Sequence, residues 1–288
     1  MSAGPRTATT RWRFEAIGVP WEIETAEPLP GSVRDEVLAI VEAFDATWSR
    51  FRADSVVRRL ADHPGAVSAP PDAGAMLDAY AELSAATGGA VNPLVGDALA
   101  HRGYDAGLGL ADRGAIATPA WTPLLEWDAD ELRLRHPATI DVGALGKGRL
   151  VDRVMTALPA GDAVVDASGD LAVRGAPQRI GLEHPFDARR AIGVWEVRDA
   201  ALCASATNRR SWGDGLHHVL DARTGEPVRT IAATWAVAGT AMRADAIATA
   251  LFFDGGERLA REWGVEWVRM TTDGRVEWSP GSRAELFT

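Results

Sequence analysis

Cysteine is nearly absent from this chain of 288 residues, because Cys203 is the only one. A single thiol excludes both an intramolecular disulfide and a metal site built from several cysteines. No run of about 18 apolar residues occurs, which excludes a membrane-spanning helix. Basic residues are also in deficit, with 30 Lys+Arg against 40 Asp+Glu. This balance disfavours nucleic acid or an anionic membrane as a partner.

The first residues lack the features of an export signal. Residues 1–12 are small, polar and basic, with no apolar core segment and no cysteine for lipid attachment. We therefore expect a cytoplasmic protein without stable membrane insertion. We also expect residues 1–10 to form a disordered tail.

Apolar material is ample, with 47% hydrophobic against 24% charged residues, as is typical of a folded globular protein. Apolar residues recur with helical periodicity at 32–48, 71–86 and 243–253. Short strand patterns lie at 163–166, 171–174, 202–206 and 234–238. Further strands are expected over 12–25, bent at Gly18-Val19-Pro20, and over 139–142. Because helices and strands do not alternate regularly, the order favours an α+β fold. We expect a single compact domain over 11–288, with a mixed or antiparallel sheet core and flanking helices.

Several familiar catalytic signatures are missing from the sequence, namely GxGxxG after a strand, GxSxG and HExxH. The run 143–148, Gly-Ala-Leu-Gly-Lys-Gly, resembles a P-loop, but only two residues separate its first glycines and Arg149 replaces the Ser or Thr that binds magnesium. We reject a P-loop on these grounds. The run still joins a predicted strand to a helix, so its N–H groups and Lys147 could bind a pyrophosphate or another anion. The alternative is a strand–helix turn with a surface lysine.

Two more segments place polar groups near strand ends. The run 166–170, Asp-Ala-Ser-Gly-Asp, suits a backbone that closely approaches a ligand, although a plain tight turn is the commoner origin of such a run. His217 and His218 lie in a strand pattern, so one can point into a site while the other packs. A histidine there could act as a general base, because its ordinary pKa is close to neutrality. The alternative is a structural or exposed pair.

Asp245 and Thr249 are four residues apart in a predicted helix and therefore share one face. A carboxylate and a hydroxyl are both oxygen donors, which suit Mg²⁺ better than zinc. The alternative is that Asp245 caps the helix and Thr249 bonds back to its own helix.

Taken together, these segments resemble the FAD:protein FMN transferase family, also called ApbE, from about residue 14 to residue 253. The matching runs are Ile17-Gly18-Val19, Ser49-Arg50-Phe51 with Ser55 and Arg59-Leu60, Gly88 to Pro93, Asp141 to Gly148, Ser168-Gly169-Asp170, His217 to Gly225 and Ala244 to Thr249. The chain departs from the family pattern at Ile17 and Val19, which replace Met and Thr, and at Ala222, which replaces proline.

The resemblance implies an α+β enzyme that binds FAD and Mg²⁺. Such an enzyme transfers the FMN half of FAD to a Ser or Thr in the flavinylation motif of an acceptor protein and releases AMP. The implied metal ligands are Asp245, Thr249 and the backbone carbonyl of Gly146. His218 is the implied proton acceptor, although an aspartate could serve instead, and Lys147 would lie near the phosphates. The implied FAD contacts are Gly18, Asp141, Gly143, Lys147, Gly169, Asp170, Ser205, His218, Asp221 and Thr224.

Two other functions use the same features. The first is a Mg²⁺-dependent FAD pyrophosphatase, in which water replaces the acceptor hydroxyl. The second is a protein that binds FAD without any reaction. AMP release without an acceptor protein would indicate the pyrophosphatase, and no AMP under any condition would indicate the binding protein.

Overall fold

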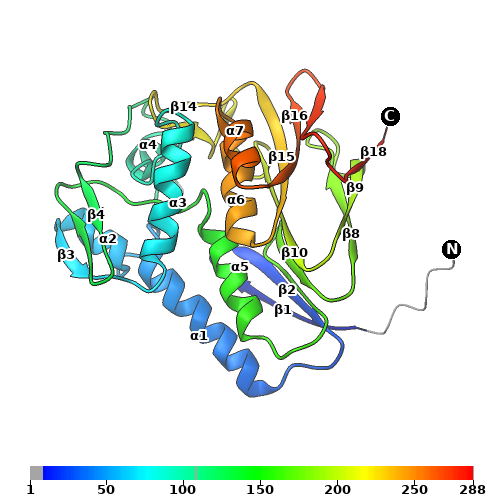
Figure 1. The fold of residues 1–288 in the computed structure, drawn as a ribbon. Coiled ribbons are helices and arrows are strands. Elements are labelled where there is room, and N and C mark those ends of the chain that lie inside the picture. The colour runs from blue at the N-terminus through cyan, green and yellow to red at the C-terminus, as the bar shows by residue number, and fades with distance from the viewer. Residues whose placement is uncertain (1–8, 108, 288) are drawn as a thin grey trace, which may run out of the picture.

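A computed structural model of the chain describes residues 9–107 and 109–287. Its centre is a sheet of eight strands in the order β1-β2-β6-β7-β10-β15-β16-β17, with every neighbouring pair antiparallel (Figure 1). The strands are β1 (Thr10–Ala16), β2 (Val19–Thr25), β6 (Ala163–Asp166), β7 (Asp170–Arg174), β10 (Ala200–Ala206), β15 (Ile231–Ala238), β16 (Glu266–Thr271) and β17 (Val276–Trp278). The expected α+β class with an antiparallel core is confirmed.

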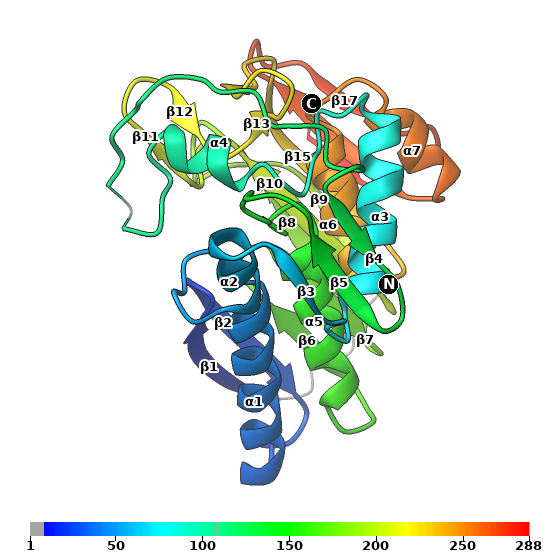
Figure 2. The same cartoon turned by 90° about the vertical axis from the view of Figure 1, so that its left-hand side faces the viewer.

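The described residues form seven helices, some of which cover one face of this sheet. They are α1 (Gly31–Trp48), α2 (Val56–Asp62), α3 (Ala73–Ala86), α4 (Gly96–His101), α5 (Gly146–Ala157), α6 (Ala241–Ala250) and α7 (Gly256–Glu262). Helices α5 and α6 contact each other and the central strands, whereas α1 packs on α5, and α3 packs on α6 and α7 (Figure 2). None of the helices in the described part of the chain is both long and apolar enough to cross a bilayer.

Smaller sheets complete the fold. Strands β8 (Gln178–Glu183), β9 (Ala191–Val197) and β18 (Glu285–Leu286) form one, and β3 (Gly65–Ser68), β4 (Leu125–Trp127) and β5 (Glu131–Leu134) form another. Two short pairs are β11 (Ser211–Trp212) with β12 (Leu216–His217), and β13 (Leu220–Asp221) with β14 (Glu226–Pro227). The sheet of β8, β9 and β18 packs through Leu182, Ile192 and Trp195 against the face of the central sheet that the helices leave open.

Strand β15 shows why the helices lie where they do. Every residue of this strand is buried, as expected for a strand covered on both faces. Trp235 and Val237 pack toward β8 and β9, whereas Ala236 and Ala238 belong to the core on the helical side. The small alanines let α6, itself rich in buried alanine, lie close to the sheet. This packing holds Asp245 of α6 in the protein interior.

Three expectations at the level of single elements are wrong. The segment 12–25 is a hairpin of β1 and β2 rather than one bent strand, because Ile17 and Gly18 both have positive φ angles of 47° and 74° and reverse the chain. Thr10 begins β1, so it does not belong to a tail; residues 1–8 of the expected tail lie outside the described residues. The segment 139–142 is not a strand, and its backbone instead bonds to the residues around Pro93.

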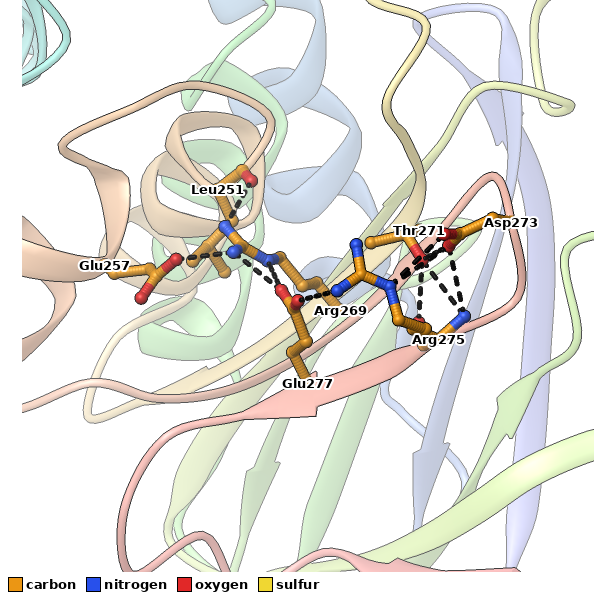
Figure 3. Close-up of polar contacts among 7 residues, drawn as sticks. All are labelled: Leu251, Glu257, Arg269, Thr271, Asp273, Arg275 and Glu277. Atoms are coloured by element: carbon orange, nitrogen blue, oxygen red, sulfur yellow. Dashed lines mark hydrogen bonds and ion pairs between the residues drawn. The ribbon is translucent and has the colours of Figure 1, made fainter.

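A charged network joins the C-terminal hairpin to the helices (Figure 3). Arg269 on β16 donates through Nε to Glu277 on β17 at 2.7 Å, and its Nη2 lies 2.5 Å from a carboxylate oxygen of Glu257 on α7. The Arg269 side chain is 18% exposed, whereas the neighbouring Arg275 is 70% exposed and pairs with Asp273. From its partly buried position Arg269 therefore links β16, β17 and α7, whereas Arg275 makes only local contacts at the surface.

We expect Arg269→Ala to lower the free energy of unfolding by about 1–2 kcal/mol, because it removes charge-assisted hydrogen bonds and leaves two glutamates close together. Arg275→Ala is the matched control and should cost less than about 0.5 kcal/mol, since exposed ion pairs contribute little. Urea denaturation of both variants measures the difference. Equal losses in the two variants would contradict the assignment.

Candidate active site

A cavity of about 1280 Å³ opens where the end of α1, the start of α5, the β6–β7 turn, the end of β10 and helix α6 meet. Pockets for drug-sized ligands usually occupy roughly 300–1,000 Å³, so this cavity can hold a larger molecule. Most of the predicted site residues line it, namely Gly18, Asp141, Gly143, Gly146, Lys147, Gly169, Asp170, Ser205, His218, Asp245 and Thr249. Segments more than 200 residues apart in the sequence thus converge on one cavity.

Asp221 and Thr224 are the two predicted residues that do not line the cavity. The Asp221 carboxylate lies 2.6 Å from Nη2 of Arg223, and its backbone carbonyl accepts the N–H of Gly225 at 2.7 Å. The Arg223 side chain lowers the pKa of Asp221 by hydrogen bonding to it. Thr224 accepts the N–H of Glu226. Both residues therefore build the turn between β13 and β14, and the prediction that they contact FAD is not supported by their positions.

Lys147, in the first turn of α5, is the only lysine in the chain. Its Nζ donates to the carbonyl oxygens of Ala167 at 2.8 Å and Ser168 at 3.2 Å, and lies 3.1 Å from Oδ2 of Asp170. Two of the three ammonium donors therefore go to carbonyl oxygens, and the contact with Asp170 is an ion pair without hydrogen-bond geometry. Lys147 thus fixes the β6–β7 turn, in which Ser168 has a positive φ of 54°. Its charge is directed at that turn as well as at the cavity.

We expect Lys147→Met to lower the free energy of unfolding by about 3–5 kcal/mol, because it leaves the buried carboxylate of Asp170 without its cation. Adding Asp170→Asn should restore most of the loss, since the uncompensated charge then disappears. Urea denaturation in the presence of a chelator, run on both variants, makes the comparison. If the free energy of unfolding of Lys147→Met equals that of the wild type, the ion pair has no structural role.

Asp170 and Asp245 form a pair of buried carboxyl groups, 1% and 4% exposed. Oδ2 of Asp245 accepts the N–H of Gly148 at 3.0 Å, which joins α6 to the start of α5. Burial raises the pKa of Asp245 well above its ordinary value, and the charge of Asp170 raises it further. Oδ2 of Asp170 makes no hydrogen bond of good geometry despite its proximity to Lys147. Two buried carboxylates are costly unless cations neutralise them, and Lys147 supplies only one positive charge.

Gly148 makes this arrangement possible. A Cβ at this position would lie 2.3 Å from the carbonyl oxygen of Ala241 and 2.8 Å from Cβ of Asp245. Only glycine allows the two helices to approach so closely. Thr240 is the N-cap of α6, and Asp152 accepts the N–H groups of Ala241 and Met242. Asp245 is therefore not the cap of its helix, which removes the alternative explanation for that residue.

The donors around this pair are suited to a hard cation. Asp245, Thr249 and Gly146 all line the cavity, and they offer a carboxylate, a hydroxyl and a backbone carbonyl. Within residues 9–107 and 109–287, no cluster of three or more His, Cys, Asp or Glu side chains could hold a metal. A metal at this position would thus depend on hydroxyl and carbonyl oxygens beside the carboxylates, as Mg²⁺ often does.

The two adjacent histidines have different surroundings. Nε2 of His217 lies 2.8 Å from the carbonyl oxygen of Val228, and its Nδ1 accepts the N–H of Val219, so His217 is a neutral structural residue. His218 lines the cavity, and its Nδ1 is buried with no hydrogen-bond partner in the described part of the chain. Burial and the nearby charge of Arg210 lower the pKa of His218 to about 3. His218 is therefore neutral near pH 7, with an unused nitrogen.

Sequence reasoning missed an aromatic and cationic wall of the same cavity, formed by Arg50, Phe51, Tyr104 and Trp212. Arg50 donates through Nε to Asp141 at 2.6 Å and through Nη1 to the carbonyl oxygen of Tyr104 at 2.8 Å. The Tyr104 ring stacks on Trp212 with centroids 5.4 Å apart. The Ser-Arg-Phe run was the one local signal, and it did not indicate that Arg50 pairs with a residue 91 positions away.

The chain matches a family model described as the ApbE family over residues 17–268. It is 33% identical over 171 residues to a FAD:protein FMN transferase of Rhodobacter capsulatus, in a match that covers 54% of the chain and 32% of that relative. It is 28% identical over 291 residues to a FAD:protein FMN transferase of Treponema pallidum, covering 86% of the chain and 79% of the relative.

Solved structures agree on the fold. The crystal structure of the ApbE protein from Thermotoga maritima matches with a TM-score of 0.82 at 23% identity, covering 94% of this chain and 97% of that one. A flavin transferase ApbE from Vibrio cholerae matches with a TM-score of 0.79 at 20% identity, with the same coverage. At these identities the likeness concerns the fold.

Proposed function

Because the chain belongs to the ApbE family, we propose that it transfers the FMN half of FAD to a Ser or Thr hydroxyl of an acceptor protein. The hydroxyl oxygen attacks the phosphorus of the FMN half, and the bond from that phosphorus to the oxygen of the AMP half breaks. The products are a phosphoester on the acceptor and free AMP, and the hydroxyl proton passes to a base. The observation that carries the proposal is the buried Asp170–Asp245 pair beside the start of α5, in a cavity large enough for a dinucleotide.

We propose that Mg²⁺ binds at Asp245, Thr249 and the carbonyl oxygen of Gly146. The second carboxylate, Asp170, whose only cationic partner is Lys147 among the described residues, and the raised pKa of Asp245 support this fit, since a divalent cation would add the missing positive charge. When bound, Mg²⁺ supplies charge that neutralises the phosphate oxygens during transfer. The N-terminus of α5 lies at the same position, and the positive end of its helix dipole favours an anion there.

Two side chains have proposed roles in the transfer. His218 lies on the cavity wall with a nitrogen that has no partner among the described residues, and in the transfer it accepts the proton of the acceptor hydroxyl. Its pKa of about 3 makes it a weak base until the anionic diphosphate of the bound substrate raises that pKa. Lys147 holds the β6–β7 turn, and with it Asp170 and Gly169, against the start of α5. Its role is thus to position the acidic pair, with its charge close to the bound phosphates.

Mass spectrometry of a candidate acceptor, after incubation with this protein, FAD and Mg²⁺, tests the proposal. We expect an FMN adduct on a Ser or Thr and one AMP for each adduct. Rapid release of AMP and free FMN without any acceptor would favour the pyrophosphatase. Binding of FAD with no AMP at all would favour a non-catalytic FAD-binding protein. The cytoplasmic location stays a prediction, which fractionation of the native cells would test.

A further inference from the structure

Arg50 has an unused hydrogen-bond donor at the cavity wall. Its side chain is 4% exposed, and its Nε and Nη1 are bonded to Asp141 and to the carbonyl oxygen of Tyr104. Its Nη2 is buried and has no partner among the described residues. A buried donor without an acceptor destabilises the folded protein, so native proteins rarely retain one. Since Arg50 lines the cavity, a ligand in the cavity is the natural source of the missing acceptor.

The surroundings of Arg50 restrict the chemistry of that acceptor. The guanidinium lies over the Phe51 ring at 4.2 Å and near the Tyr104 ring at 5.0 Å, and Tyr104 stacks on Trp212. This wall therefore suits a flat aromatic ligand. The carboxylate of Asp141 is bonded to the same guanidinium and neutralises it. It would also repel a phosphate at Nη2, whereas a neutral carbonyl oxygen suffers no such repulsion.

On the premise of the proposed function, we propose that Nη2 of Arg50 donates a hydrogen bond to a carbonyl oxygen on the pyrimidine edge of the flavin ring. Of the two ring systems in FAD, only the isoalloxazine carries carbonyl groups in its plane, whereas the acceptors of adenine are ring nitrogens. On this proposal Arg50 places the flavin end of the substrate at the aromatic wall, and the AMP measurement below distinguishes the two rings. The diphosphate is left for the wall formed by Lys147, Asp170 and Asp245.

The test compares Arg50→Lys with the wild type by measuring the Kd of riboflavin, FMN and AMP in the presence of Mg²⁺. A lost hydrogen bond from a charged donor weakens binding by roughly tenfold to a hundredfold. We expect this loss for riboflavin and FMN, with the Kd of AMP unchanged. A loss for AMP with unchanged riboflavin binding would place Arg50 against adenine and overturn the inference. Unchanged Kd values for all three ligands would overturn it as well.

A second measurement covers the case in which Arg50→Lys does not fold, because Asp141 then loses its partner. Riboflavin analogues with sulfur in place of the oxygen at C2 or at C4 are weaker hydrogen-bond acceptors. Their Kd is measured with the wild-type protein, so no variant has to fold. One of the two should bind at least about tenfold more weakly than riboflavin. If both analogues bind with the same Kd as riboflavin, the inference is overturned. A wild-type protein that binds no flavin would instead refute the proposed function, so the two failures are distinguishable.

Discussion

Replacing Asp245 by Asn should slow AMP release from FAD by about 10³-fold or more, which corresponds to about 4 kcal/mol of transition-state stabilisation. Asn keeps the shape of the side chain and can still accept the N–H of Gly148, so the helix contact survives. It lacks the negative charge that holds a divalent cation. Rates of AMP formation at saturating FAD and Mg²⁺ measure the effect.

A stability measurement separates this role from a structural one. Because Asp245→Asn removes one of two buried carboxyl groups that repel each other, the variant without metal should be at least as stable as the wild type. Asp254→Asn is the matched control, since Asp254 is exposed and lies outside the cavity, and its rate should be unchanged. A variant of Asp245 that releases AMP at the wild-type rate would refute the metal assignment.

His218→Gln should lower the rate of FMN transfer about 10²-fold to 10³-fold, within the range for loss of a general base. His136→Gln, at an exposed position, is the control and should have no effect. The pH profile adds a sharper test. With a pKa of about 3, His218 is neutral at every pH above about 4. The pH profiles of kcat/KM for the wild type and His218→Gln should therefore not differ by an inflection near pH 6.5. Such an inflection would contradict the buried, neutral imidazole.

The same lowered pKa of His218 makes stability depend on pH in a defined direction. An unfolded histidine has a pKa near 6.5, so between about pH 6.5 and pH 3 the unfolded chain binds a proton that the folded chain does not. The stabilising effect is complete above about pH 6.5 and is lost as the pH falls toward 3. The midpoint of thermal unfolding should therefore drop between pH 7 and pH 4, and the drop should be smaller in His218→Gln. An identical drop in both proteins would contradict this account.

The sequence predicted those parts of the site that depend on local spacing. Asp245 and Thr249 share a helical face by periodicity, and the histidine pair in an extended segment put one ring in the cavity and one in the core. What it could not predict are contacts across the fold. The Arg50–Asp141 pair and the three partners of Lys147 join segments 20 to 91 residues apart, and no local pattern encodes them.

Predictions from local patterns were also wrong where the backbone groups bond to residues that are distant in the sequence. The segment 139–142 alternates like a strand, yet its backbone groups bond to the loop around Pro93 and Gly96, so no ladder forms. Asp221 and Thr224 follow the histidine pair closely in sequence, but the tight turn closed by Gly225 directs both of them to turn contacts. A prediction from sequence order alone cannot tell a turn residue from a ligand contact.

A crystal structure with FAD and Mn²⁺ in place of Mg²⁺ would test the central proposal most directly, because anomalous scattering locates manganese without ambiguity. We expect one Mn²⁺ peak bound by the carboxylate of Asp245 and the hydroxyl of Thr249, with the diphosphate of FAD beside it. FAD bound in the cavity with no Mn²⁺ at Asp245, or with its diphosphate turned away from the start of α5, would contradict the account.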